Sequence, residues 1–402
     1  MSEIDAVRLE SEVYPVVKIH AFGEIKNGGT PSSDEANWDG DIPFITPPDL
    51  NGLDSKSVAS VGRTITELGL KQGSNLVENG VIISGRAPVG YVGVVVTPSA
   101  FNQGCKAICT AQNHRYVAYA LTASKSNLQV LANGTTFSEI SSTALANYAI
   151  PLPPLEIQRR IADYLDRETA EIDAAVADLD RYVELLESRK IEKLKELIFA
   201  DNEGEFPLIP VQLLFRKISS GSTPKGEHFY AESGNGVPWV TTSELREKII
   251  TETKKNVTPQ AVEKVSGLVV FPRDTILIAM YGATIGRFGR LGVNATSNQA
   301  CCALIDPIGI DPEFFYYSLY VHSRELVKQA FGGGQPNINQ NTIRRFRAPV
   351  PSLAKQKEIA REMKIMVAET EDIIAESTKL RDLLLKRRSV LITEVVTGRK
   401  QV

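Results

Sequence analysis

The stretch PLPPLEIQRRIA at residues 151–162 returns without a gap, 198 residues further on, as PVPSLAKQKEIA at residues 349–360. The same offset continues beyond it, where Leu185-Leu186 and Arg189-Lys190 are matched by Leu383-Leu384 and Arg387-Arg388. A repeat at a fixed period indicates that one structural unit occurs twice. We therefore predict the order module, spacer, module, spacer.

Both spacers are predicted to be long helices that begin just after prolines. Apolar residues recur in them at alternating steps of three and four, which is typical of a coiled-coil seam. In the first spacer these positions are Ile161, Leu165, Ile172, Ala175, Leu179, Tyr182 and Leu186. The equivalent positions in the second are Ile359, Met363, Thr370, Ile373, Ser377, Leu380 and Leu384. Each helix should have about 40 residues and a length of roughly 60 Å.

An apolar seam on so long a helix needs a partner that covers it. The most direct partner is the other helix, in an antiparallel pair. Such a pair would relate the two modules by a pseudo-twofold axis, a symmetry that the half-sites of many DNA targets also have. The alternative is that each helix packs only on its own module.

The modules themselves repeat more loosely. Residues 28–31 (GGTP) match 221–224 (GSTP), residues 42–44 (IPF) match 237–239 (VPW), and residues 102–105 (NQGC) match 298–301 (NQAC). Runs of β-branched and aromatic residues between Gly and Pro, such as 81–83 and 275–279, predict strands. The predicted fold class is therefore α+β, with two mixed α/β domains at residues 1–150 and 201–348. Two long helices, at residues 151–200 and 349–402, separate them and form an antiparallel coiled coil, with an internal pseudo-twofold repeat.

Charge differs between the two modules. The whole chain has 402 residues and a net charge of −3. Residues 1–150 contain 10 Lys and Arg against 14 Asp and Glu, a net of −4, whereas residues 206–349 contain 16 against 11, a net of +5. Only the second region has the positive charge that is typical of a DNA-binding domain.

The sequence resembles one family, the specificity subunits of type I restriction-modification systems. The resemblance covers essentially the whole chain. It is carried by the helix opening at 151–161, by residues 279–286 (AMYGATIG), 298–300 (NQA) and 334–339 (GQPNIN), and by Val396-Thr397-Gly398. It implies two target recognition domains that each read one half of a bipartite sequence in double-stranded DNA. The helix pair would act as the ruler that fixes the gap.

The resemblance also implies which subunits bind this chain and which of them hold the cofactors. Two modification (methyltransferase) subunits, which hold S-adenosylmethionine and methylate adenine, would dock on this chain. Restriction subunits with nuclease and translocase activity would join them. We therefore expect no cofactor in this chain, with S-adenosylmethionine, ATP and Mg in the partner subunits.

The first module departs from the family pattern at two places. Residues 134–137 (GTTF) stand where the second module has 332–335 (GGGQ), and residues 82–86 (IISGR) replace 277–282 (LIAMYG). Since this module is also negatively charged, we expect the modification subunit to supply much of the phosphate contact at its half-site.

Residues in Gly-rich or polar loops are the candidates for DNA contact, because Arg, Lys, Asn and hydroxyl side chains reach phosphates and base edges. They are Lys217, Ser222, Thr223, Lys225, Tyr281, Arg287, Arg290 and Asn339 in the second module, and Asn27, Thr30, Arg86 and Lys106 in the first. Each could instead be an ordinary turn or solvated residue.

Charged positions on the helices, away from the predicted seam, are candidates for contact with the modification subunits. They are Arg159, Arg160, Arg189, Lys190, Arg387 and Arg388, with Lys357 and Glu358 in equivalent places. A solvated charged face is the other interpretation. A structural coiled-coil protein whose modules bind protein remains an alternative function.

The sequence offers little for catalysis. It has no phosphate-binding Gly-x-x-x-x-Gly-Lys-Ser/Thr loop, and Thr46-Pro47-Pro48-Asp49 is only remotely like an adenine-methyltransferase motif. Ser222-Thr223-Pro224-Lys225 has the Ser-x-x-Lys spacing of acyl-transferring enzymes without their other motifs. Asp49 with Glu252-Thr253-Lys254 faintly resembles a nuclease set. We predict a non-catalytic subunit, with the serine enzyme as the enzymatic alternative.

The remaining residues predict an ordinary intracellular protein. Cys105, Cys109, Cys301 and Cys302 lie in apolar runs without paired spacing, so we expect reduced thiols, neither disulfides nor metal ligands. The histidines, His20, His114, His228 and His322, have no ligand spacing. There is no secretory signal and no apolar run that could span a bilayer, so we expect a cytoplasmic protein without membrane contact.

Overall fold

The computed structural model describes residues 8–133, 139–199, 206–231, 235–329 and 337–402. The chain divides into two compact units, which are described separately below. Unit 1 comprises Met1–Asp180 with Lys379–Val402, and unit 2 comprises Arg181–Thr378. Each unit therefore combines one module with a part of each long helix. The predicted boundaries at residues 150, 200 and 348 stay a prediction.

The module of unit 1 is built on two four-stranded sheets. Its sheet β2-β9-β6-β7 is antiparallel, and a second sheet has the order β4-β3-β8-β5. The strands are β1 (Val16–Lys18), β2 (Gly23–Asn27), β3 (Trp38–Ile45), β4 (Thr64–Ile65), β5 (Asn75–Val77), β6 (Gly80–Ser84), β7 (Val92–Val95), β8 (Ser99–Phe101), β9 (Cys105–Thr110) and β10 (Ala149–Pro151). The helices are α1 (Glu67–Lys71), α2 (His114–Ala123), α3 (Lys125–Asn133) and α4 (Ser142–Asn147), with short 3-10 turns at Ile19–Ala21, Glu35–Asn37 and Pro47–Leu50.

The module of unit 2 repeats this plan. Its first sheet has the order β12-β20-β17-β18-β15, of which the first four strands correspond to β2-β9-β6-β7, and its second sheet is β13-β16-β14-β19. The strands are β11 (Leu208–Pro210), β12 (Phe215–Ser220), β13 (Tyr230–Ala231), β14 (Val237–Val240), β15 (Lys248–Ile250), β16 (Asn256–Val257), β17 (Ile276–Ala279), β18 (Phe288–Leu291), β19 (Thr296–Ser297), β20 (Cys301–Pro307) and β21 (Arg347–Pro349). The helices are α6 (Val211–Leu214), α7 (Pro259–Lys264), α8 (Pro312–Lys328) and α9 (Gln340–Arg345), and 3-10 turns lie at Glu227–Phe229 and Thr242–Glu244.

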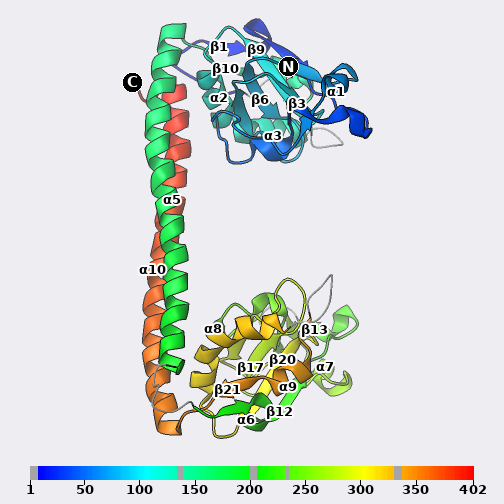
Figure 1. Ribbon diagram of the computed structural model, residues 1–402, viewed down its shortest axis with the longest axis vertical. Coiled ribbons are helices and arrows are strands. Elements are labelled where there is room, and N and C mark those ends of the chain that lie inside the picture. Colours follow the sequence, from blue (N-terminus) through cyan, green and yellow to red (C-terminus); the bar gives the residue numbers. More distant parts are fainter. Residues whose placement is uncertain (1–7, 134–138, 200–205, 232–234, 330–336) are drawn as a thin grey trace. The chain divides into compact units, whose positions relative to one another are not determined.

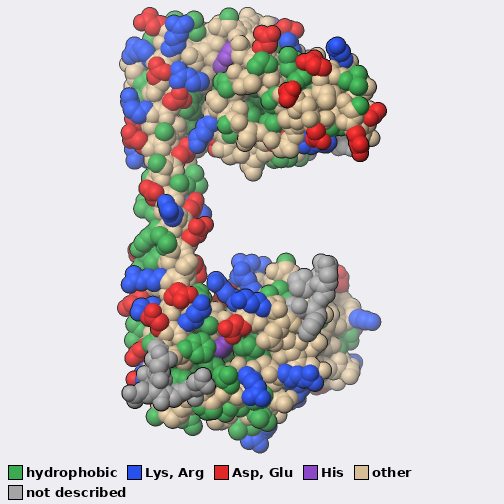
Figure 2. All heavy atoms as spheres, in the orientation of Figure 1, with side chains coloured by type: hydrophobic (Ala, Val, Ile, Leu, Met, Phe, Trp, Pro, Cys, Tyr) green, Lys and Arg blue, Asp and Glu red, His purple; other side chains and the backbone are tan. Residues whose placement is uncertain are grey.

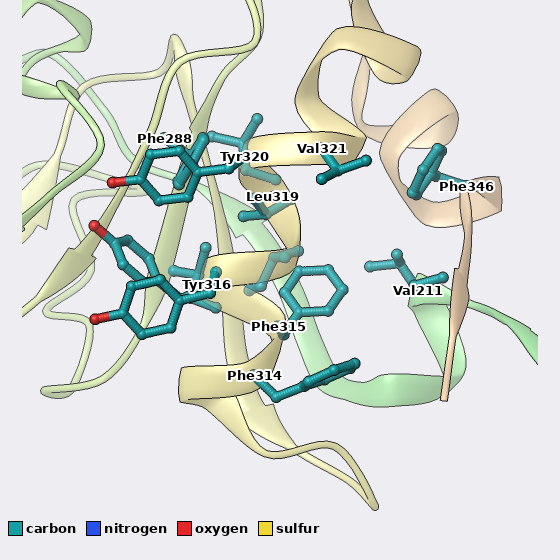
Figure 3. Packing of buried hydrophobic residues seen from close by; sticks show 14 of the residues in the cluster. Val211, Phe288, Phe314, Phe315, Tyr316, Leu319, Tyr320, Val321 and Phe346 are labelled. Atoms are coloured by element: carbon teal, nitrogen blue, oxygen red, sulfur yellow. The ribbon is translucent and has the colours of Figure 1, made fainter. Parts of the chain in front are cut away.

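One helix in each module forms the link between the first sheet and the long helices. Asn113 caps α2 by accepting from the backbone N–H of Tyr116, and Asp311 caps α8 by accepting from Glu313 and Phe314. Such capping satisfies N–H groups that a helix end leaves unpaired. Figure 3 shows the core around α8, with Phe288, Tyr316 and Tyr320 on one side of the helix and Val211 and Phe346 on the other.

The predicted long helices are α5 (Leu155–Phe199) and α10 (Leu353–Val396). In each unit, part of α5 lies beside part of α10 (Figure 1). In unit 1 the early residues Ile161, Leu165 and Ile172 share a core with the late residues Leu391, Ile392 and Val395. In unit 2 the late residues Ile191, Leu194 and Ile198 share a core with the early residues Ile359, Met363 and Val367. The pairing is therefore antiparallel, as predicted. Each helix also packs on its own module.

The predicted seam is correct at most positions and wrong at three positions in the middle of the helices. Tyr182, Ile373 and Leu380 were predicted to face the partner helix, but their side chains are 45%, 41% and 50% exposed. Their neighbours Val183 and Ile374 are less exposed. Lys190 and Arg388, which were predicted to face away from the seam, are buried at 5% and 6% exposed. The inner positions thus include two cations, which an apolar pattern does not detect.

The apolar runs around the four cysteines correctly predict that these side chains are buried or partly buried. Cys105, Cys301 and Cys302 are buried, Cys109 is partly buried, and all four are free thiols. Burial raises the pKa of each of these thiols. None of the helices in the described segments combines the length and hydropathy needed to cross a membrane.

Candidate functional site

Two loops meet at the same place in both modules. Residues 28–31 and residues 102–105 meet in unit 1, and residues 221–224 meet residues 298–301 in unit 2. Thr30 donates a hydrogen bond to the side-chain oxygen of Gln103, and Thr223 does the same to Gln299. All four side chains are exposed. The structure therefore places two sequence-predicted threonines each next to a glutamine that the sequence reasoning did not select.

The close approach of these loops depends on glycine. A Cβ on Gly28 would lie 1.8 Å from the carbonyl oxygen of Asn102, and one on Gly221 would lie 1.8 Å from that of Ser297. No side chain can be accommodated there without moving the backbone. The side chains of Asn102 and Asn298 stabilise their own loops, because they accept from the backbone N–H groups of Gly104 (3.0 Å) and Ala300 (3.2 Å) two residues further on. The duplicated loop pair offers Gln and Thr side chains on a rigid frame.

A second pair of candidates also occupies equivalent positions. Arg86 forms an isolated antiparallel bridge with Glu139, and Tyr281 forms one with Asn337. The Nε of Arg86 lies 2.9 Å from a carboxylate oxygen of Glu139. The Tyr281 side chain is 38% exposed, and burial raises its pKa. The segments 134–137 and 332–335 that distinguish the modules, and residues 334–336 of the family run, lie outside the described residues.

Asn27 and Lys106 belong to an internal network of unit 1. Lys106 is 5% exposed, and its Nζ donates to Asn27 Oδ1 at 3.1 Å. Burial lowers the pKa of Lys106, while the nearby carboxylate of Glu139 opposes this shift. In unit 2, Ser220 occupies the position of Asn27, and its hydroxyl accepts from the side-chain amide of Gln340. Cys302 on β20 lies opposite Ser220, where unit 1 has Lys106. Lys106 thus replaces a thiol in the interior, and its ammonium group contacts other residues of the module.

The other candidates of the second module fall into two groups. Lys217 and Lys225 are exposed, and so is Arg287, which lies 3.2 Å from a carboxylate oxygen of Glu247. Arg290 has a side chain only 14% exposed, between Asp274, Glu313 and the ring of Tyr316. Asn339 caps α9 by accepting from the N–H of Thr342 at 2.9 Å. Arg290 and Asn339 therefore have structural contacts within the module.

The structure gives the enzymatic alternatives no support. Ser222-Thr223-Pro224-Lys225 forms a loop instead of the helix that places the serine and lysine of such enzymes together. The backbone of Ser222 is held by Ser297 and by the indole of Trp239. Asp49, which the nuclease interpretation uses, accepts from the backbone N–H groups of Thr46 (2.8 Å) and Gly62 (2.9 Å). Glu244 makes the equivalent bonds in unit 2, so this carboxylate is a repeated loop-stabilising element.

No cluster of three or more His, Cys, Asp or Glu side chains with the geometry of a metal site occurs among the described residues. His228 and His20 are exposed, whereas His114 bonds to the backbone oxygen of Thr110. His322 is buried beside Phe346, and its Nε2 has no hydrogen-bond partner in the described part of the chain.

One buried glutamine attaches each long helix to its module. Gln158 accepts from the N–H of Asn113 at 3.0 Å and donates to the carbonyl of Pro153 at 2.8 Å. Gln356 repeats this with Asp311 (2.6 Å) and Pro351 (2.8 Å). Both are 0% exposed. The helix-opening motif in the sequence is therefore the joint between helix and module.

The helices carry exposed apolar side chains at repeated positions. Tyr182 and Leu185 in unit 2 are 45% and 61% exposed, and Leu380 and Leu383, which are their equivalents in unit 1, are 50% and 54% exposed. Of the predicted partner-binding residues, Arg159, Arg160, Arg189 and Arg387 are exposed, as are Lys357 and Glu358. Lys190 and Arg388 are buried and make contacts inside their own units.

Surface charge differs between the modules, as the sequence indicates. Figure 2 shows Lys and Arg side chains grouped over the module of unit 2, whereas Asp and Glu side chains are frequent on the module of unit 1. A positive surface attracts the phosphates of nucleic acid.

Sequence comparison matches residues 12–177 and 214–380 to the family described as "Type I restriction modification DNA specificity domain". The curated protein described as "Type I restriction enzyme MjaIX specificity subunit", from Methanocaldococcus jannaschii, is 24% identical over 93% of this chain and 92% of its own length. The two matched segments are the two copies of the repeat.

Two solved structures have a similar fold. One chain, from a study of complex assembly and conformational transition of the type I R-M system, has 14% sequence identity and a TM-score of 0.68 over 97% of this chain and 100% of its own. The HsdS subunit from Thermoanaerobacter tengcongensis has 14% identity and a TM-score of 0.51 over 97% of this chain and 98% of its own.

Proposed function

Because the chain belongs to the type I restriction-modification DNA specificity family, we propose that each of its modules reads one half of a bipartite sequence in double-stranded DNA. The observation that carries this proposal is the loop pair that occurs in both modules. Glutamine can pair with adenine through two hydrogen bonds in the major groove. A glutamine held by a neighbouring threonine loses less rotamer freedom when it binds, so it is suited to reading a base.

The chain is the non-catalytic specificity subunit of its system. We assign methyl transfer, with S-adenosylmethionine, to modification subunits. Nuclease and translocase activities, with ATP and Mg, belong in this proposal to restriction subunits. The chain would act in the cytoplasm, where the DNA is.

Two modification subunits would dock on the helices, one on each copy of the exposed apolar pair. Tyr182 with Leu185, and Leu380 with Leu383, offer the same chemistry twice. The two members of each pair are three positions apart, so they adjoin on the helix surface. Adjoining exposed apolar side chains are typical of a protein interface. The exposed cations Arg159, Arg160, Arg189 and Arg387 lie on the same two helices and would contribute charge complementarity at the rim.

The experiment is selection of bound DNA from a randomised pool, with the full chain and its modification subunits. The proposal predicts that the selected molecules share two short half-sites at a constant distance. If the chain instead retains proteins and no particular DNA sequence, it is an assembly protein and the proposal is wrong.

A further inference from the structure

Each unit contains a cavity at the junction between its module and the two helices. The volume is about 600 Å³ in unit 1 and about 580 Å³ in unit 2. Seven of the lining positions correspond at the offset of 198 residues, among them Thr122 with Tyr320, Asp173 with Glu371, and Arg388 with Lys190. The same junction is therefore built twice, but with different side chains.

In unit 1 the junction is ionic. The guanidinium of Arg388 on α10 lies 2.9 Å from a carboxylate oxygen of Asp173 on α5 and 3.5 Å from one of Asp54, which is in a loop of the module. Lys56 in the same loop lies 2.9 Å from the other oxygen of Asp173. These four residues are the unit 1 junction. Arg388 thus contacts the module and both helices.

Burial makes this arginine depend on its two acidic partners. Its side chain is only 8% exposed, and an unpaired cation in such a place would be strongly unfavourable. The planar guanidinium can bind two carboxylates at once, which the ammonium group of lysine does less specifically. Arg388 therefore holds the loop at Asp54 in one position relative to α5 and α10.

In unit 2 the junction uses hydroxyl groups. The hydroxyl of Tyr320 on α8 lies 2.9 Å from the carbonyl oxygen of Glu247 and 3.2 Å from a carboxylate oxygen of Glu371 on α10. Tyr316 donates to the same carbonyl at 2.7 Å. The Nζ of Lys190 lies 3.1 Å from a carboxylate oxygen of Glu187 on its own helix, and it faces the ring of Tyr320. Tyr316, Tyr320, Glu247 and Glu371 are the unit 2 junction.

The loops at both junctions contain residues with a strained, left-handed backbone conformation. Asp54 and Ser55 have φ values of 41° and 85°, and Glu247 has 51°. Residues other than glycine rarely adopt this left-handed region, and they do so where surrounding contacts compensate for the strain. Ser55 is fixed by Thr122 at 2.7 Å between the two hydroxyl oxygens. The junction contacts thus keep a strained loop in place in each unit.

We propose that Arg388 and Tyr320 are positioning residues, which fix how each module is seated on the helices of its own unit and thereby set the gap between the two half-sites. This inference rests on the proposed function, because a gap exists only if both modules read DNA. A module that can tilt on its helices would accept half-sites at more than one distance. The helix length and the two junctions would then determine the gap together.

The test compares DNA targets whose gap is the selected length, one base pair shorter or one base pair longer. The full chain with its modification subunits is used, as the wild type and as the variants Asp54→Asn and Tyr320→Phe. The preference is the ratio of the affinity for the selected gap to the affinity for a gap that is one base pair different. We expect this ratio to be about tenfold lower in each variant than in the wild type. Discrimination against base changes within a half-site should stay within about twofold of the wild type. Arg388→Lys should restore part of the preference that Arg388→Met loses.

Matched controls are Lys386→Met, on the exposed face of α10, and Tyr317→Phe, which removes a hydroxyl from the same helix as Tyr320. Asp54→Asn leaves Asp173 paired with Arg388, so this variant should fold even where Arg388→Met does not. If Asp54→Asn and Tyr320→Phe keep the wild-type gap preference, with or without a lower melting temperature, the inference is overturned and the proposed function stands. If the wild type itself selects no bipartite sequence, the proposed function fails, and the inference with it.

Discussion

The hydroxyl of Thr223 donates a hydrogen bond to the side-chain oxygen of Gln299, across the contact between two exposed loops of unit 2. The same bond joins Thr30 to Gln103 in unit 1. The two halves of the chain have diverged in charge and in many loop residues, yet this pair is present in both. The pair therefore provides the first place to test base reading.

Replacing Gln299 by Ala should weaken discrimination at one base pair of the second half-site. The loss should be roughly 1–3 kcal/mol, the range of one bidentate side-chain contact to a base. The loss is measured by comparing the binding affinity for the selected target with that for targets that each carry one base change. Gln260→Ala, on the exposed surface of α7, is the control. Equal discrimination by Gln299→Ala and the wild type at every position would remove this glutamine from the reading surface.

Gly28→Ala should destabilise unit 1, since its new methyl group would lie 1.8 Å from the carbonyl oxygen of Asn102. We expect a loss of about 2–3 kcal/mol in the free energy of unfolding, as for other overpacked sites. Denaturant unfolding gives the value. Gly62→Ala is the matched control, because the nearest atom to its Cβ would be 3.6 Å away. Equal stability of the two variants would show that the loops are not in close contact.

Much of this architecture can be predicted from the sequence, because it depends on a repeat. The offset of 198 residues identifies α5 and α10, and their apolar seams indicate the antiparallel pairing, but Tyr182, Ile373 and Leu380 are wrongly assigned to the seam. Lys190 and Arg388 occupy buried positions that an apolar pattern does not detect. Their burial depends on Glu187 in one case and on Asp54 and Asp173 in the other.

The candidate site is harder to predict, because its residues meet across long separations. Thr30 and Gln103 are 73 positions apart, and Thr223 and Gln299 are 76 apart. Loop composition selects Thr30 and Thr223 but carries no information on which side chain each one meets. It also selects Arg290 and Asn339, whose contacts lie within the module.

Stability of unit 2 should depend on pH through His322. Burial lowers the pKa of this histidine below its ordinary value of 6.5, although Glu325 opposes the shift. Below pH 6.5 the unfolded chain therefore binds a proton that the folded chain does not bind until its lower pKa is reached. The free energy of unfolding should fall as the pH is lowered from 6.5 toward that lower pKa.

The comparison of His322→Leu with the wild type isolates this effect. We expect the variant to lose this contribution to the pH dependence, while His228→Leu, at an exposed position, keeps it. Thermal unfolding at several pH values between about 5 and 8 is sufficient. The same slope in His322→Leu as in the wild type would assign the pH dependence to other groups.

Salt should weaken the contact with the second half-site more than the contact with the first. Residues 206–349 have a net charge of +5 and residues 1–150 a net charge of −4. Each phosphate that a cation neutralises makes the slope of log K against log salt more negative by about 0.9. The full chain can be titrated with DNA that contains only one half-site at a time. Equal slopes for the two targets would contradict the expected difference.

In the proposed function, one DNA-reading module occurs twice on an antiparallel helix pair. The most direct measurement uses a chain in which residues 8–150 are replaced by a second copy of residues 206–348, followed by selection of bound sequences from random DNA. We expect the second half-site to be selected twice, as an inverted repeat around an unread gap. A direct repeat, or an unchanged asymmetric target, would contradict it.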